Sequence, residues 1–208
     1  MKEWKGNSNS AHAAIAAKKP GSTNKREQND FYATDPEALD RLIGMCHGWL
    51  YDMFSIARKS GIWECACGSG NLAECLKKYF KDVHATDLID HGYGIPYIDF
   101  LHVPISGYPV ILTNPPYSLA TEFIEHALEI LPEGGLYIAL MNITYLAGQK
   151  RYQRVYSKGS LREIYVFSKR VECWKNGERP KDKCGSIANY AWYVFQKGYI
   201  GQPTLYWL

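Results

Sequence analysis

The sequence predicts an α/β domain in which a mostly parallel sheet carries helices on both faces. Short apolar runs typical of buried strands alternate with amphipathic stretches typical of helices, and this alternation indicates βαβ units. The 208 residues fit a single domain, which we place at residues 31–208. A hydrophobic content of 46% allows a sizeable core and excludes a wholly disordered or fibrous chain.

The folded part is predicted to follow a basic N-terminal tail. Residues 1–30 have almost no large apolar side chain, so they cannot bury enough surface to offset the entropy of ordering, and we expect them to be flexible. Thr34 or Asp35 can then cap a helix that starts at Pro36 and runs to about His47.

The next elements are predicted from the apolar period and from glycine and proline at the breaks. Strands are predicted at residues 62–65, 83–86, 110–113, 136–141, 163–167 and 190–195. Helices are predicted at residues 71–80, around 123–128, and at 149–154. The polar connection at residues 169–186 has no period of its own, so we expect a loop that is functional or mobile.

The net charge of +3 conceals a strong asymmetry along the chain. Residues 1–30 carry a net +3, residues 31–149 a net −8 and residues 150–208 a net +8. An acidic middle with a basic last third suggests chemistry in the first and contact with a polyanion in the second. The alternative is that the basic residues form an ordinary solvated surface.

Other compositional features predict a cytoplasmic protein without a metal site. No run of 18 apolar residues is present, so we expect no membrane-spanning helix, and the N-terminal segment lacks the apolar stretch of a secretion signal. The six cysteines do not have the paired CxxC spacing of zinc sites, so we interpret them as reduced thiols.

A glycine-containing loop follows the first predicted buried strand. Residues 64–70 (ECACGSG) precede a helix, where glycines allow the backbone close to a ligand and the helix N-terminus offers free N–H groups. Asp87 ends the next strand, 17 residues after Gly70, a position suited to a ribose diol. The loop therefore predicts a nucleoside cofactor. Ala73 stands where a dinucleotide fingerprint has its third glycine, which weakens a nicotinamide interpretation.

The tetrapeptide Asn-Pro-Pro-Tyr at residues 114–117 comes directly after another buried strand. In an open α/β sheet this turn would lie beside the cofactor. The amide oxygen of Asn114 and the carbonyl of Pro115 could accept hydrogen bonds from one planar amino group, and Tyr117 could stack on a planar base. The alternative is a common Pro-Pro turn with a packed tyrosine.

The order of these motifs resembles that of the S-adenosylmethionine-dependent amino-methyltransferases, especially small DNA adenine-N6 methyltransferases of phages and prophages. The motifs that carry the resemblance are residues 31–36, residues 64–70, Asp87 and residues 114–117. Further similar segments are residues 92–94, 99–100, 168–171 and 191–203. The resemblance covers about residues 30–208. It implies a class I, Rossmann-like methyltransferase fold: a three-layer sandwich with a mixed seven-stranded sheet and a C-terminal antiparallel strand pair.

The resemblance also implies a role for each matching residue. From the methionine end of S-adenosylmethionine to its adenine, the matching residues are Tyr32 and Thr34, then Glu64, Ala66, Gly68 and Gly70, then Asp87 and Leu88, then Asp99 and Phe100. The first two would touch the methionine, the next four would surround the methionine and the sulfonium, and the last four would contact the ribose and adenine. The catalytic turn would be formed by Asn114, Pro115, Pro116 and Tyr117. Cys65 and Cys67 depart from the family, which often has proline before the small residue of this loop.

The implied reaction is methyl transfer to adenine N6 in DNA, with the target base flipped out of the duplex by a monomeric enzyme in a bacterial cell. Methylation of cytosine N4, an RNA base or a protein glutamine stays open, as does a silent nucleic-acid-binding protein with this fold. A nicotinamide oxidoreductase would leave the Asn-Pro-Pro-Tyr turn unexplained. The basic part at residues 150–185 is the predicted DNA-binding region. Its candidate contacts are Lys150, Arg151, Arg154, Lys169, Arg170 and Lys175.

Overall fold

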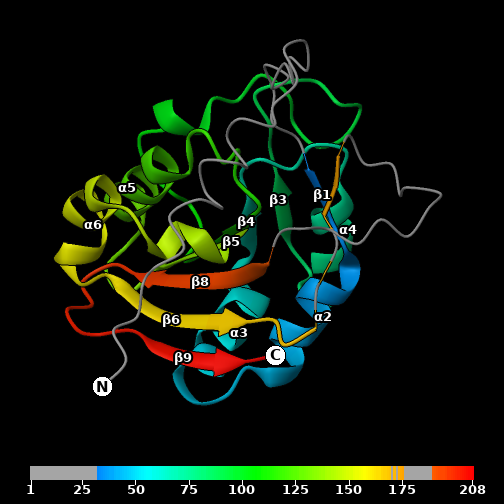
Figure 1. The fold of residues 1–208 in the computed structure, drawn as a ribbon. Coiled ribbons are helices and arrows are strands. Elements are labelled where there is room, and N and C mark those ends of the chain that lie inside the picture. The colour runs from blue at the N-terminus through cyan, green and yellow to red at the C-terminus, as the bar shows by residue number, and fades with distance from the viewer. Residues whose placement is uncertain (1–31, 170, 172, 176–188) are drawn as a thin grey trace, which may run out of the picture.

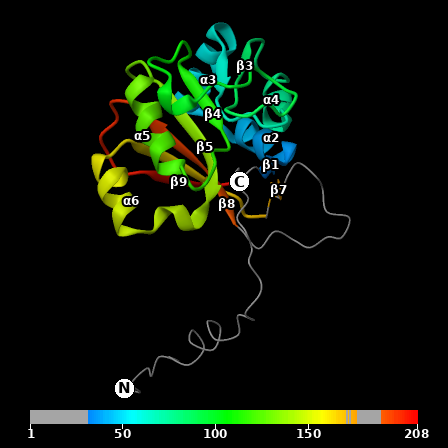
Figure 2. The same cartoon turned by 90° about the horizontal axis from the view of Figure 1, so that it is seen from above.

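The computed structural model describes residues 32–169, 171, 173–175 and 189–208, and the predicted tail at residues 1–30 lies outside them. A seven-stranded mixed sheet has the strand order β3-β2-β4-β5-β8-β6-β9. Helices cover both of its faces, with α5 and α6 on one side and α2, α3 and α4 on the other (Figures 1 and 2). The predicted α/β sandwich is confirmed.

The sheet contains all six predicted strands. Four of them are parallel: β2 (Ile62–Glu64), β3 (Val83–Ala85), β4 (Val110–Thr113) and β5 (Leu136–Asn142). The strand β8 (Tyr190–Gln196) runs antiparallel to β5 and to β6 (Leu161–Val166), so the predicted antiparallel pair is confirmed. A further strand, β9 (Thr204–Trp207), was not predicted; it lies at the sheet edge, parallel to β6, with mostly exposed side chains. An edge strand of this kind has no buried apolar run for a sequence pattern to reveal.

The helices agree with the prediction in position more than in length. Their bounds are α2 (Pro36–Met45), α3 (Gly48–Ser60), α4 (Asn71–Leu76), α5 (Ala120–Ile130) and α6 (Gln149–Arg154). Short 3-10 turns occur at η1 (Phe100–His102), η2 (Ile143–Leu146) and η3 (Tyr156–Lys158). Asp35 caps α2 as predicted, with its Oδ1 3.0 Å from the backbone nitrogen of Glu37. No helix in the described part of the chain is both long and apolar enough to cross a membrane.

Three helix predictions are corrected. The helix expected to reach His47 ends at Met45, because Cys46 has extended backbone angles. The helix expected to reach Phe80 ends at Leu76, after which the N–H groups of Lys78 and Tyr79 bond to carbonyls three residues back. Helix α3 was missed, although it buries Leu50, Phe54 and Ala57 at helical spacing.

A separate two-stranded ribbon joins the beginning of the described chain to a segment far along the sequence. The strand β1 (Tyr32–Thr34) pairs antiparallel with β7 (Cys173–Lys175), beside α4 and apart from the large sheet (Figure 1). The expectation of a structureless loop at residues 169–186 is therefore wrong for β7. This strand exists because β1 offers it a hydrogen-bonding edge, and a partner so distant in sequence leaves no local pattern.

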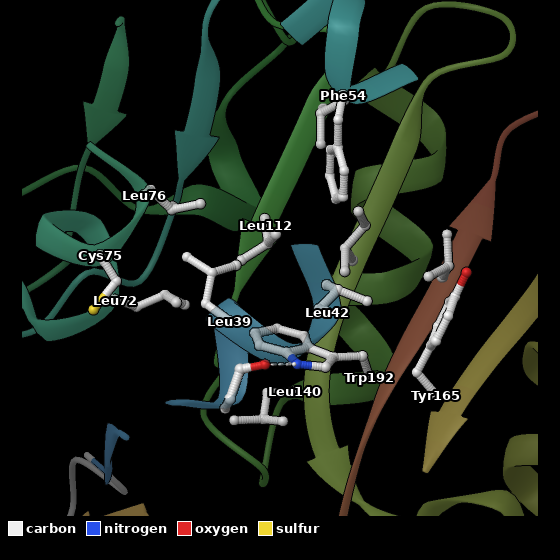
Figure 3. Close-up of a cluster of buried hydrophobic side chains, with 14 of the residues drawn as sticks. Leu39, Leu42, Phe54, Leu72, Cys75, Leu76, Leu112, Leu140, Tyr165 and Trp192 are labelled. Carbon is white, nitrogen blue, oxygen red and sulfur yellow. Dashed lines mark hydrogen bonds between the residues drawn. The ribbon is translucent and has the colours of Figure 1, made fainter. Parts of the chain in front are cut away.

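The core has two halves, because alternate side chains of β4 and β5 point to opposite faces of the sheet. Figure 3 shows the half beneath α2, α3 and α4, where Leu112 and Leu140 of the sheet meet Leu39 and Leu42 of α2. Trp192 of β8 is fully buried there, and its indole nitrogen donates to the carbonyl of Ala38 at 2.9 Å. This contact fixes α2, and with it the adjoining strand β1, against the sheet.

We expect Trp192→Phe to lower the free energy of unfolding by about 1–3 kcal/mol, because the variant loses a buried hydrogen bond and leaves unfilled space. Urea denaturation measures this change. Trp207→Phe is the matched control, since Trp207 is 64% exposed and its replacement should change stability by less than about 0.5 kcal/mol. Equal effects of the two substitutions would contradict the anchoring role of Trp192.

Candidate active site

A cavity of about 180 Å³ opens at the carboxyl ends of β2, β3 and β4. This is the point where the strand order changes direction, the usual ligand site of open α/β sheets. A single buried water needs only about 10–15 Å³, so this cavity has room for an organic ligand. Its lining includes the predicted residues Thr34, Glu64, Ala66, Asp87, Leu88, Asp99, Phe100, Asn114 and Pro116.

The glycine-containing loop wraps tightly around one end of this cavity. Gly70 has φ +89°, and a Cβ there would lie 2.5 Å from the ring of Tyr93, so only glycine fits. The Tyr93 hydroxyl is anchored by the carboxylate of Glu74 at 2.6 Å. On the other side of the loop, the backbone nitrogen of Gly68 donates to Asp87 Oδ2 at 2.8 Å. The loop is thereby tied to the end of β3.

Glu64 is the most deeply buried acidic residue of the site, with 1% of its surface exposed. Its Oε1 accepts a hydrogen bond from the hydroxyl of Thr113 and another from the backbone nitrogen of Ala66. Its Oε2 is buried and has no hydrogen-bond donor among the described residues. Burial raises the pKa of Glu64 to about 8, with a smaller contribution in the same direction from Asp87, against hydrogen bonds that lower it.

The cysteines of the loop are not activated nucleophiles. Burial and the nearby carboxylates of Glu64 and Asp87 raise the pKa of Cys67 to about 12, and the pKa of the buried Cys65 is also raised. A thiol of this kind stays protonated at neutral pH. No group of three metal-ligating side chains occurs within the residues that the structure describes.

Two further acidic residues lie along the cavity. Asp87 Oδ1 accepts from the backbone nitrogen of Ile89 at 2.9 Å, so each of its oxygens already has one fixed donor. Asp99 caps η1, with Oδ1 3.0 Å from the nitrogen of Leu101 and Oδ2 2.7 Å from Nδ1 of His102. These contacts hold both carboxylates in place and leave lone pairs for a ligand.

Phe100 lies directly after Asp99 and closes the floor of the cavity. Its ring is 2% exposed and packs 5.4 Å from the ring of Trp63 and 4.8 Å from that of Phe123. The aromatic cluster gives this end of the cavity an apolar surface, which suits a flat heterocycle.

The Asn-Pro-Pro-Tyr turn forms the opposite wall. Asn114 Nδ2 donates to Thr34 Oγ1 at 3.2 Å, which joins the turn to β1. The carbonyls of Pro116 and Tyr117 accept from the backbone nitrogen of Leu119 and the hydroxyl of Tyr145, both at 2.9 Å. Within the described part of the chain, no donor contacts the carbonyl of Pro115. The turn therefore keeps one main-chain acceptor available next to Asn114.

The remaining predicted site residues flank the cavity. Gly68, Gly70, Pro115 and Tyr117 belong to the two loops that shape it, and the Tyr117 ring is partly buried 6.3 Å from that of Tyr190. Tyr32 lies in β1, and its side chain is not among those that the structure describes. The prediction missed lining residues that follow within six residues of the motifs, including Asn71, His91, Ser118, Leu119 and Phe123. Their position next to the motifs was the available indication.

The basic candidates have different surroundings. Arg154 pairs with Glu122 at 2.9 Å and Glu125 at 2.5 Å on α5, while Arg151 donates to main-chain carbonyls around η2. Lys150 and Lys169 are exposed and carry no ion pair among the described residues. Arg170 and the side chain of Lys175 lie outside the described residues.

Comparison with known proteins identifies the architecture. No family model and no curated protein matches the chain. Among solved structures, the type IIG restriction endonuclease BpuSI matches 85% of this chain and 27% of its own, with a TM-score of 0.59 and 15% identity. A Listeria monocytogenes protein provisionally assigned to the class I S-adenosylmethionine-dependent methyltransferases matches 85% of this chain and 65% of its own, with a TM-score of 0.55 and 16% identity.

A third match has the same character. The methyltransferase subunit of a type I restriction-modification system from Streptococcus thermophilus matches 82% of this chain and 45% of its own, with a TM-score of 0.55 and 13% identity. The fold is that of the class I methyltransferases. The chain spans less than two thirds of the length of each of these three proteins.

We expect the stability of the protein to depend on pH through Glu64. Its pKa is about 8 in the folded state against a usual 4.5, so between these values the unfolded chain gives up its proton first, and stability falls as pH rises. Relative to Glu64→Gln, which has no carboxyl proton to lose, the wild-type unfolding free energy should fall by up to about 1.4 kcal/mol per pH unit. Urea denaturation from pH 5 to 8 measures the difference, and parallel curves for the two proteins would refute it.

Proposed function

We propose that this protein transfers a methyl group from S-adenosylmethionine to the exocyclic N6 of adenine in DNA. The observation that carries the proposal is the Asn-Pro-Pro-Tyr turn, which places Asn114 and Pro116 in the lining of a cavity of about 180 Å³, while no described residue donates to the carbonyl of Pro115. Acceptors at these two positions suit a planar amino group, which presents two N–H donors in one plane.

The residues of the cavity fit S-adenosylmethionine. Its ammonium needs a buried acceptor, and Glu64 Oε2 supplies one that no described residue satisfies. Its ribose diol needs a fixed carboxylate, and Asp87 is held in place by the N–H groups of Gly68 and Ile89. Its adenine needs an apolar surface next to an acceptor, which Phe100 and Asp99 provide. When bound, the cofactor supplies an activated methyl group.

The chain itself contributes positioning. Asn114 and Pro115 would accept hydrogen bonds from the two amino hydrogens of the target base, which draws the nitrogen toward tetrahedral geometry and exposes its lone pair. Alignment of reacting groups is worth several kcal/mol, up to roughly 7–11. A base in duplex DNA must first leave the stack at a cost of a few kcal/mol, and Tyr117 would then receive it on its ring.

Two observations favour DNA as the substrate: exposed basic side chains in the last third of the chain, and structural similarity to proteins of restriction systems. Lys150 and Lys169 are exposed cations that can contact phosphate. Two of the structural relatives belong to restriction systems, which suits an enzyme that acts on DNA. We assign the protein to the cytoplasm of a bacterial host as a phage or prophage enzyme, on the strength of the motif order.

The test incubates the purified protein with S-adenosylmethionine and, separately, with unmethylated duplex DNA, single-stranded DNA and RNA. Each polymer is then digested, and its nucleosides are identified by mass spectrometry. N6-methyladenine in DNA alone is the expected result. N4-methylcytosine or a methylated RNA base would change the assigned target. Absence of product in all three polymers would reject a nucleic-acid substrate and leave a protein glutamine as the amide to examine.

We expect Asn114→Ala to reduce methylation below detection while S-adenosylmethionine binding stays within about threefold of wild type. The substitution removes one acceptor for the target amino group, whereas the acidic residues of the cofactor cavity are unchanged. Isothermal titration calorimetry measures the binding, and nucleoside mass spectrometry measures the product. Loss of cofactor binding in the variant would contradict the assigned role.

The charge argument makes a separate prediction for DNA affinity. Lys150→Ala should weaken binding of nonspecific duplex DNA and reduce the slope of log K against log salt by about 1. Lys59→Ala is the matched control. Lys59 is also exposed, but it lies near the end of α3, next to the amino end of β2, whereas the candidate site lies at the carboxyl ends of the strands. Fluorescence anisotropy at several salt concentrations measures both, and equal slopes for the two variants would exclude Lys150 from the interface.

A further inference from the structure

A tyrosine outside the cavity contacts the Asn-Pro-Pro-Tyr turn from behind. Tyr145 lies in η2, which directly follows β5, and its hydroxyl donates to the main-chain carbonyl of Tyr117 at 2.9 Å. The two prolines of the turn have no N–H with which to bond to the rest of the protein. The orientation of the turn therefore depends on contacts made by the residues at its ends, and Tyr145 supplies one of them.

Tyr145 is itself held by two other residues. The guanidinium carbon of Arg151 lies 4.5 Å from the centre of the Tyr145 ring, and Arg151 Nε donates to the main-chain carbonyl of Tyr145 at 3.0 Å. The hydroxyl of Tyr156 donates to the same carbonyl at 2.8 Å. The ring and the backbone of Tyr145 are thus fixed from α6 and from η3.

The donors of Arg151 are directed to η2. Besides Tyr145, the guanidinium contacts the carbonyl of Ala147 and that of Thr144, the latter at 3.4 Å. These carbonyls lie in and just after the 3-10 turn, where a helical segment leaves acceptors unsatisfied. Arg151 therefore completes the local structure of η2. A count of basic residues along the sequence cannot distinguish this structural role from contact with phosphate.

We propose that Tyr145 is a positioning residue for the catalytic turn and that Arg151 locks Tyr145 in place. The inference rests on the proposed function, since it assigns a purpose to the turn. It has a structural consequence: α6 presents Lys150 to solvent and, one residue later, holds the catalytic turn through Arg151 and Tyr145. The segment assigned to DNA contact and the turn assigned to chemistry are joined by two side chains, those of Arg151 and Tyr145.

The first test is hydrogen–deuterium exchange of the wild type and Tyr145→Phe, which lacks only the hydroxyl. Loss of one hydrogen bond should increase exchange in peptides covering residues 114–120 by about 3- to 10-fold and leave the loop at residues 64–70 unchanged. Tyr199→Phe is the matched control, because the Tyr199 hydroxyl also donates to a main-chain carbonyl, that of Gln202, at 3.0 Å. Unchanged exchange at residues 114–120 in Tyr145→Phe would overturn the proposal.

The second test is kinetic. Tyr145→Phe should lower kcat for methyl transfer by about 3- to 10-fold with an unchanged dissociation constant for S-adenosylmethionine, whereas Tyr199→Phe should retain wild-type kcat. Faster exchange with wild-type kcat would overturn the positioning role. A wild-type protein that methylates nothing would reject the proposed function instead, and the exchange result would then decide by itself whether Tyr145 holds the turn.

Arg151→Lys separates a lock from a phosphate contact, because lysine keeps the charge and loses the planar fork. As a lock, the variant should show the faster exchange and lower kcat of Tyr145→Phe, with wild-type salt dependence of DNA binding. Wild-type exchange and kcat in Arg151→Lys would overturn the locking role.

Discussion

The rest of the site depends on the buried carboxyl group of Glu64. It lies at the end of β2, and its Oε1 joins the hydroxyl of Thr113, at the end of β4, to the backbone of Ala66 in the glycine-containing loop. Burying a carboxyl group is costly, and burial accordingly raises the pKa of Glu64 above its usual value. The effect is geometric: the glycine-containing loop and the strand that leads into the Asn-Pro-Pro-Tyr turn both donate to one oxygen, Glu64 Oε1.

The Asn-Pro-Pro-Tyr turn that follows Thr113 is held at both of its ends. Thr113 immediately precedes Asn114, whose amide donates to Thr34 on β1, while the carbonyl of Tyr117 accepts from Tyr145. The prolines between them are stiff and cannot donate, so contacts at the two ends are enough to determine the path of the turn. Among the described residues, no donor contacts the carbonyl of Pro115 between these two ends.

Sequence reasoning reached the features that depend on local chemistry. Asp35 is an N-cap, residues 68–70 form a turn before a helix, and Asp87 lies two residues after the end of β3, and each of these requirements acts within a few residues of the chain. Apart from helix α3, which was missed despite its local helical spacing, it failed where the determining partner is distant. Strand β7 needs the edge of β1, strand β9 needs the edge of β6, and neither segment has an apolar period of its own. The orphaned oxygen of Glu64 was likewise invisible, since only the fold shows which of its two oxygens finds a donor.

The net charge of the last third of the chain also cannot be interpreted from sequence alone, because it does not show which basic residues have partners in the fold. Residues 150–208 carry a net +8, yet two of their arginines already bind other groups of the protein. Arg154 neutralises Glu122 and Glu125 of α5, and Arg151 satisfies carbonyls around η2. A cation with such partners gives up existing contacts to bind a phosphate, whereas an exposed lysine gives up only water. Attraction for a polyanion therefore depends on the unpaired cations, and α6 combines both kinds: Lys150 faces solvent while Arg151 stacks on the ring of Tyr145.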